Sequence, residues 1–174
     1  MKYQDCIAPV QAPAETADGG ARQCDANINP RTGLATDYLN HFNEAIMLLE
    51  MLAACPDCIE DFLAWRPLSY REHFAASRFK GHELAIKAYE DAEPRLRETL
   101  DALSSTMTAV LLATRGALRA EMRPKSTAVI AARAVACLKP LVARAGAVVN
   151  GEAGEAEPTA PQAAVDGLMK QISS

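Results

Sequence analysis

The sequence predicts an all-α protein, an up-down bundle of three to four main helices with short connecting helices and flexible termini. Apolar residues make up 49% of the chain but aromatic residues only 5%, and much of the difference is alanine. Alanine favours helices because it loses no side-chain entropy there. Apolar residues also recur at steps of three and four in long segments, which is the helical period. The length of 174 residues suits one domain.

The bundle domain is expected to span residues 34–150. Residues 1–33 are rich in Ala, Pro, Gly, Asp and Asn and show no apolar period, which predicts a disordered or loosely ordered segment. This N-terminal segment also lacks the apolar core of a secretory signal, so we expect a cytoplasmic protein with reduced cysteines.

The first bundle helix, residues 36–55, is apolar on two sides. One stripe comprises Tyr38, Phe42, Ile46, Leu49 and Ala53, and the other side carries Leu39, Met47, Leu48, Met51 and Leu52. A helix of this kind must be covered on both sides, so it is either central to the fold or part of a subunit interface. For the second case we expect a homodimer whose interface contains Tyr38, Phe42, Leu48, Met51 and Leu52.

Three short helices are predicted next. Pro56 should end the first helix and open a second at residues 57–65. Ser69 and Glu72 have the spacing of a capping box for a third helix at residues 70–77. Gly81 precedes a fourth at residues 82–92.

Two long helices complete the bundle. Pro94 either begins a new helix or kinks the fourth one, and the segment that follows has a coiled-coil-like seam. The seam comprises Leu96, Leu100, Leu103, Met107, Val110, Thr114 and Ala117 or Leu118. Ser126 is the expected cap of the last helix, residues 127–149, in which Pro140 should cause a kink. Asn150 and Gly151 form a good helix stop.

The segment after the bundle divides into two parts. Residues 151–161 have the composition of a flexible linker, and residues 162–174 predict a short amphipathic tail helix. Its apolar side carries Val165, Leu168, Met169 and Ile172. Because so short a helix is marginal alone in water, it should dock on its own bundle or on a partner, through Leu168 and Met169 among others.

Charge argues for a protein partner. The net charge is -4 and the isoelectric point about 5.4, which disfavours nucleic-acid binding. The N-terminal part is acidic, whereas Arg115, Arg119 and Arg123 form a basic stripe at steps of four. The two halves could attract each other, or the basic half could bind an acidic protein. No run of about 18 apolar residues is present, so no membrane span is expected.

A segment rich in aromatic residues and arginine connects the first and fourth helices. Trp, Tyr and Arg dominate binding hot spots, so this elbow is a candidate for partner binding. It can equally be packing over the end of the bundle. The residues concerned are Trp65, Arg66, Tyr70, Arg71 and Phe74.

Two groups of residues could support a metal or redox centre. Asp37, His41 and Glu44 share one helical face, as metal ligands in helical bundles do. Cys55 and Cys58 form a C-x-x-C pair, but neither a second ligand pair nor a thioredoxin-like pattern accompanies it. We therefore expect no metal or other cofactor.

His82-Glu83-Leu84 resembles the core of the phosphoacceptor box in histidine-kinase dimerisation domains, although Ala85-Ile86-Lys87 replaces the usual continuation. This resemblance implies a histidine phosphotransfer-like bundle using His82.

The leading interpretation is a non-enzymatic, cytoplasmic helical-bundle protein of adaptor or regulatory type. It would act through an unidentified protein partner, with no nucleic acid and no membrane involved. A bundle with a metal or redox centre is the first alternative, and the phosphotransfer bundle is the second.

Overall fold

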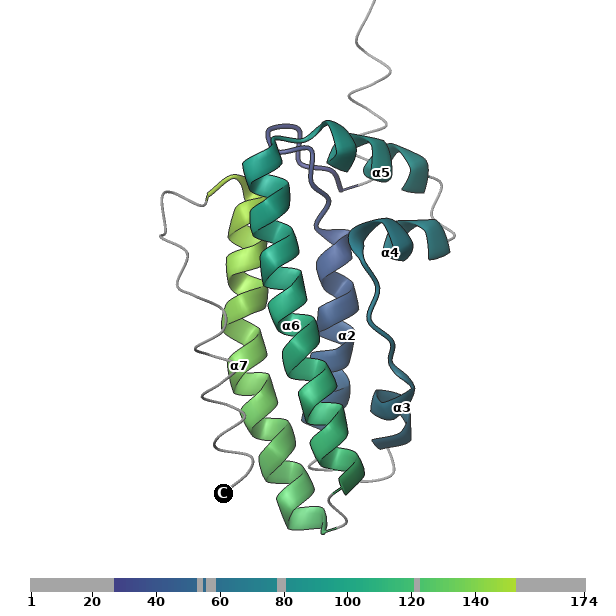
Figure 1. Cartoon of the computed structure of the whole chain (residues 1–174), viewed down its shortest axis with the longest axis vertical. Coiled ribbons are helices and arrows are strands. Elements are labelled where there is room, and N and C mark those ends of the chain that lie inside the picture. Colours follow the sequence, from purple (N-terminus) through teal and green to yellow (C-terminus); the bar gives the residue numbers. More distant parts are fainter. Residues whose placement is uncertain (1–26, 53–54, 56–58, 78–80, 121–122, 153–174) are drawn as a thin grey trace, which may run out of the picture.

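The computed structural model describes residues 27–52, 55, 59–77, 81–120 and 123–152. These residues form six helices and no strand, which confirms the all-α class (Figure 1). The helices are α2 (Asp37–Met51), α3 (Ile59–Ala64), α4 (Tyr70–Ala76), α5 (His82–Asp91), α6 (Pro94–Ala120) and α7 (Pro124–Asn150).

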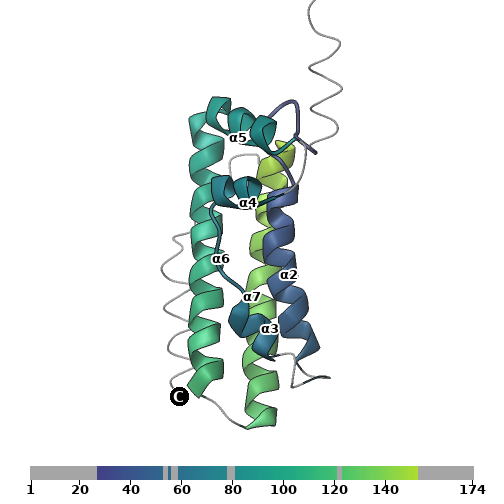
Figure 2. The same cartoon turned by 90° about the vertical axis from the view of Figure 1, so that its right-hand side faces the viewer.

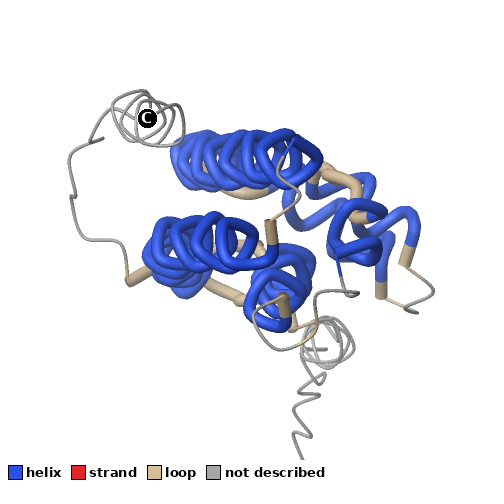
Figure 3. The backbone as a smooth tube through the Cα atoms, turned by 90° about the horizontal axis from the view of Figure 1, so that it is seen from below, coloured by secondary structure: helices blue, strands red, loops and turns tan. Residues whose placement is uncertain are grey.

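The three long helices run roughly along one axis, and α6 and α7 form an antiparallel hairpin (Figure 1). The short helices α3, α4 and α5 lie on the side of the molecule between α2 and α6 (Figure 2). Seen from below, they are grouped to one side of the long helices (Figure 3). Helix α7 packs against both α6 and α2, while α2 also contacts α3 and α4. Helix α7, rather than the predicted first helix, is therefore the one that joins the long helices.

The predicted seam of α6 lies in the core. Leu100 and Met107 are fully buried, and Leu103, Val110, Thr114 and Leu118 are nearly so. On α7, which packs against α6 and α2, the buried positions include Ala131, Ala134 and Ala145. Small side chains let two helices approach closely, which explains why an alanine-rich chain can build a packed hairpin.

Helix α2 is covered on two sides, but only partly on the second. Its stripe of Tyr38, Phe42, Ile46 and Leu49 is buried inside the single chain. On the other side Leu39 and Leu52 are buried, Leu48 is half-buried, and Met47 and Met51 are 53% and 43% exposed. Tyr38, Phe42 and Leu52 therefore belong to the core of one chain, which corrects their assignment to a dimer interface.

Residues 27–36 form a packed loop, unlike the loose segment predicted for residues 1–33. Ile28 and Ala35 form an isolated bridge, and Leu34 is fully buried. The Thr32 hydroxyl donates to the Val149 carbonyl at 2.6 Å, which ties the loop to the end of α7. Gly33 has φ +71°, and a Cβ there would lie 2.9 Å from the Ala88 carbonyl oxygen of α5. Residues 1–26 lie outside the described part of the chain.

Helix ends follow local chemistry in most places. The capping box of Ser69 and Glu72 is present on α4, and Pro94 begins α6. Helix α7 begins at Pro124 with Arg123 as its N-cap, so the predicted cap at Ser126 is wrong. Proline at the first helical position has no N–H to leave unpaired, which favours this earlier start. The helix continues through Pro140.

Gly151 ends α7 as predicted. It adopts the left-handed conformation with φ 68°, and its N–H donates to the Val148 carbonyl oxygen at 3.1 Å. The N–H of Glu152 donates to the Ala147 carbonyl oxygen at 2.8 Å. This pair of bonds is the Schellman arrangement that satisfies the last carbonyls of a helix. Apart from Gly151 and Glu152, the predicted linker (151–161) and tail (162–174) lie outside the described residues.

Residues Lys125–Asn150 of α7 are long and apolar enough to cross a membrane, by length and composition alone. The sequence alone predicts no such span, because Arg133 interrupts the apolar run. Only 28% of the most apolar window is buried within the fold. A core helix of a globular protein can pass the same test, so the finding does not assign a location.

Replacing Phe42 by alanine should lower the free energy of unfolding by about 3–5 kcal/mol, because its ring is 0% exposed and leaves a cavity. Glu44→Ala on the same helix should cost no more than about 0.5 kcal/mol, because that side chain is exposed. Urea unfolding of both variants measures the difference. Equal costs for the two variants would contradict the placement of α2.

Candidate functional site

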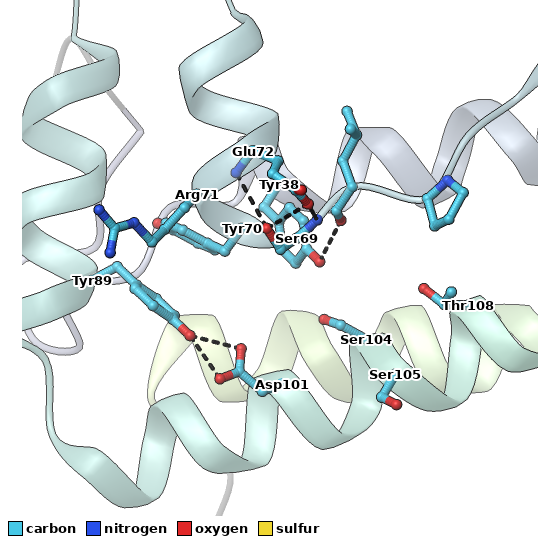
Figure 4. A pocket seen from close by; sticks show the side chains of 12 residues that line it. Tyr38, Ser69, Tyr70, Arg71, Glu72, Tyr89, Asp101, Ser104, Ser105 and Thr108 are labelled. Atoms are coloured by element: carbon cyan, nitrogen blue, oxygen red, sulfur yellow. Dashed lines mark hydrogen bonds between the residues drawn. The ribbon is translucent and has the colours of Figure 1, made fainter.

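A cleft of about 480 Å³ lies between α6 and the segment that leads into α4 (Figure 4). Helix α4 packs against α2 and α5, and this leaves the space toward α6 open. We call it the α4–α6 cleft. Its lining comprises Tyr38, Pro67, Leu68, Ser69, Tyr70, Arg71, Glu72, Tyr89, Asp101, Ser104, Ser105 and Thr108.

A group of tyrosines holds one wall of the cleft. The Tyr70 ring stacks on Tyr89 of α5, with centroids 4.3 Å apart and 17° between the planes. It also packs against Tyr38 of α2 at 5.1 Å. The Tyr70 hydroxyl accepts the Ala35 N–H at 2.8 Å, and burial raises the pKa of this phenol. Helix α4 is thus attached to α2, α5 and the loop at residues 27–36.

Tyr89 and Asp101 join the two walls. The Tyr89 hydroxyl donates to the Asp101 carboxylate and lies 2.7 Å from each of its oxygens. Burial and this hydrogen bond both raise the pKa of Tyr89, so the phenol keeps its proton. In Figure 4 the Tyr89 ring points from α5 toward Asp101 on α6.

The α6 wall presents hydroxyl groups along one helical face. Ser104 donates to the Leu100 carbonyl within the helix, whereas Ser105 is exposed and Thr108 half-exposed. On the opposite wall, Glu72 accepts from both the N–H and the hydroxyl of Ser69, and these bonds lower the pKa of the carboxyl. The described lining contains no His, Cys or Lys; its charged members are Arg71, Glu72 and Asp101, so it offers hydrogen bonds and ionic contacts.

Sequence reasoning missed most of this cleft. Asp101, Ser104, Ser105 and Thr108 recur at helical steps beside the seam of α6. That polar stripe is the signal that could have indicated it. The stripe lines a cleft only because α4 lies opposite it; on an isolated hairpin of α6 and α7 the same residues would face only water.

A second cluster lies behind the cleft, where His41 stacks on Trp65 with centroids 4.7 Å apart. The His41 Nε2 accepts the Leu68 N–H at 3.2 Å, and the His73 ring lies 5.8 Å away. Burial, and then the charge of His73, lower the pKa of His41 to about 4. Burial also lowers the pKa of His73. The neutral His41 ring therefore helps to hold the segment that lines the cleft.

The proposed metal ligands do not converge. Asp37 accepts hydrogen bonds from Asn27 at 3.1 and 3.2 Å, Glu44 is exposed, and His41 faces Leu68. No group of three or more His, Cys, Asp or Glu side chains in the described part of the chain could hold a metal ion. Cys55 is half-buried, and Cys58 lies outside that part.

The other predicted site residues divide between core and surface. Trp65, Tyr70 and Phe74 are buried, so the aromatic part of the elbow is packing rather than surface. His82 is the first residue of α5 and is half-buried. The basic residues Arg66, Arg71, Arg119 and Arg123 are exposed, and Arg115 is half-buried. Leu168 and Met169 lie outside the described residues.

Arg115 connects the basic stripe to the elbow. Its guanidinium donates to the Trp65 carbonyl at 3.1 Å, which places it next to Arg66, the neighbour of the cleft residue Pro67. Arg119 follows one helical turn later. We call Arg66, Arg115 and Arg119 the basic patch; the bond from Arg115 to the Trp65 carbonyl links it to the chain that leads to Pro67.

Comparison with protein-family models, with curated proteins and with solved structures gives no match for this chain.

Acidification should destabilise the fold through His41. The unfolded ring binds a proton near pH 6.5 and the folded one only near pH 4, so unfolding becomes easier as pH falls through this window. Between about pH 7 and pH 5 the loss attributable to His41 is about 2 kcal/mol. His41→Gln keeps an acceptor for Leu68 but does not titrate, so its unfolding free energy should depend less on pH.

Urea unfolding at several pH values measures this slope. Asn43→Gln changes an exposed residue of the same helix without removing a titrating group and should retain the wild-type slope. An identical slope in His41→Gln and wild type would contradict the assignment.

Proposed function

We propose that this protein is a non-enzymatic, cytoplasmic interaction protein that binds a segment of another protein in the α4–α6 cleft. The observation that carries the proposal is the cleft itself, an open space walled by tyrosine rings and hydroxyl groups and continued by a basic patch.

The side chains of the cleft suit a polypeptide. Hydroxyl groups both donate and accept hydrogen bonds, so Ser105 and Thr108 can pair with either the N–H or the C=O groups of a bound backbone. The tyrosine rings supply rigid contact area, as they do at many protein interfaces. The backbone of Leu68 and Ser69 is already hydrogen-bonded to His41, Tyr38 and Glu72. Recognition would therefore use side chains rather than the addition of a β-strand.

The basic patch gives the bound segment a direction. Arg66, Arg115 and Arg119 would attract acidic residues at the end of the segment that leaves the cleft near Pro67. This agrees with the acidic partner expected from the arginine stripe. The attraction should weaken with salt, because these charges lie at the surface.

A small polar ligand is the second candidate, because the cleft volume of about 480 Å³ falls within the range of small-molecule sites. In that case Tyr89, Asp101 and Ser105 would provide the polar contacts. The basic patch would then have no role, and this distinguishes the two candidates.

Selection of peptides from a random display library on the immobilised protein tests the proposal. The enriched peptides should carry acidic residues at one end. Ser105→Trp fills the cleft and should weaken their binding at least about tenfold, a loss of 1.4 kcal/mol or more. Thr99→Trp places the same ring on an exposed position of α6 outside the lining and should leave the Kd unchanged.

Equal binding of the peptides to both tryptophan variants would contradict the cleft as their site. Failure to enrich peptides, together with a small ligand whose binding is blocked by Ser105→Trp alone, would establish the second candidate instead. Circular dichroism of both variants confirms that each is folded.

A further inference from the structure

A second hollow, about 370 Å³ in volume, lies between α2 and α7. Ile46 and Met47 of α2 and Val142 of α7 form its apolar part, and Glu50 and Lys139 pair across its edge at 2.7 Å. Met47 is 53% exposed and Met51, one turn further on, is 43% exposed. We call this surface the α2–α7 groove. Exposed methionines beside a groove are typical of surfaces that accept an apolar helix.

We propose that residues 162–174 of the same chain dock in the α2–α7 groove. In this segment Val165, Leu168, Met169 and Ile172 recur at i, i+3, i+4 and i+7, so a helix would present all four on one side. Burying that side against Met47 and Val142 would stabilise a helix that is marginal alone in water.

The tether has the right length. The described chain ends at Glu152, directly after α7, and the helical rise from Val142 to Asn150 is about 12 Å. Residues 153–164 have a root-mean-square span of roughly 20 Å as a flexible chain and up to about 40 Å when extended. A tether matched to its site gives a millimolar effective concentration, and neither a second copy nor a separate partner has this advantage.

One charge also matches. On a helix, Asp166 lies at the border of the apolar side, whereas Lys170 points away from it. Lys139, which pairs with Glu50 at the groove edge, carries the charge opposite to that of Asp166. Docking can therefore place Asp166 near Lys139 and leave Lys170 in water.

Methionine-methyl NMR on the full chain tests the docking, because the protein has only six methionines. Met47 reports on the groove, Met169 on the tail, and the fully buried Met107 on the core. Single Met→Leu variants assign the signals. We expect nuclear Overhauser contacts between the Met47 and Met169 methyl groups, at a chemical shift that does not change on dilution.

Leu168→Asp combined with Ile172→Asp should abolish these contacts and shift the Met47 signal, leaving Met107 in place. Ser173→Asp adds a similar charge outside the apolar side and should change neither signal. Met47 shifts that depend on protein concentration would assign the groove to a second copy and overturn the proposal. A Met47 signal identical in wild type and the double variant would also overturn it.

Discussion

The buried hydroxyl of Tyr70 and the N–H of Ala35 connect parts of the chain that are far apart in sequence, at a distance of 2.8 Å. Tyr70 begins α4, a seven-residue helix that would be marginal in isolation and depends on tertiary contacts. Through this one side chain, α4 gains contacts with the loop at residues 27–36, with Tyr38 of α2 and with Tyr89 of α5. An unpaired N–H in that position would cost about 1–3 kcal/mol, so the loop and the helix are fixed together.

The position of α4 determines what the rest of the molecule can do. With α4 attached to α2 and α5, a space remains toward α6, and the polar stripe of Asp101, Ser105 and Thr108 faces it. The neutral His41 ring accepts a hydrogen bond from the Leu68 N–H and so fixes the segment that leads into α4. The proposed binding segment would thus contact a surface that is already ordered, which limits the entropy lost on association. The proposed tail contact lies in a different place, between α2 and α7, and its loss would leave the cleft intact.

The regular elements follow from local patterns, and the cleft does not. The seam of α6, the capping box at Ser69 and the stop at Gly151 each depend on neighbours a few residues away, so the sequence shows them directly. The sequence predicts the wrong cap for α7 because Ser126 and Pro124 are competing signals for the start of the helix. The sequence predicts a loose segment up to residue 33 because Thr32 finds its partner, the Val149 carbonyl, only in the folded molecule. The sequence makes Trp65, Tyr70 and Phe74 of the elbow candidates for partner binding. Only the folded structure shows that all three are buried.

Hydrogen–deuterium exchange of Tyr70→Phe tests the central role of this contact most directly, because the variant removes one oxygen and keeps the ring. Faster exchange is predicted at Ala35 and throughout α4, with the buried amides of α6 and α7 as slow as in the wild-type protein. Tyr89→Phe is the matched control, because its hydroxyl bonds the exposed Asp101, which water can solvate instead. Wild-type exchange rates in the loop and in α4 of Tyr70→Phe would contradict the account, and so would an equal acceleration over the whole chain.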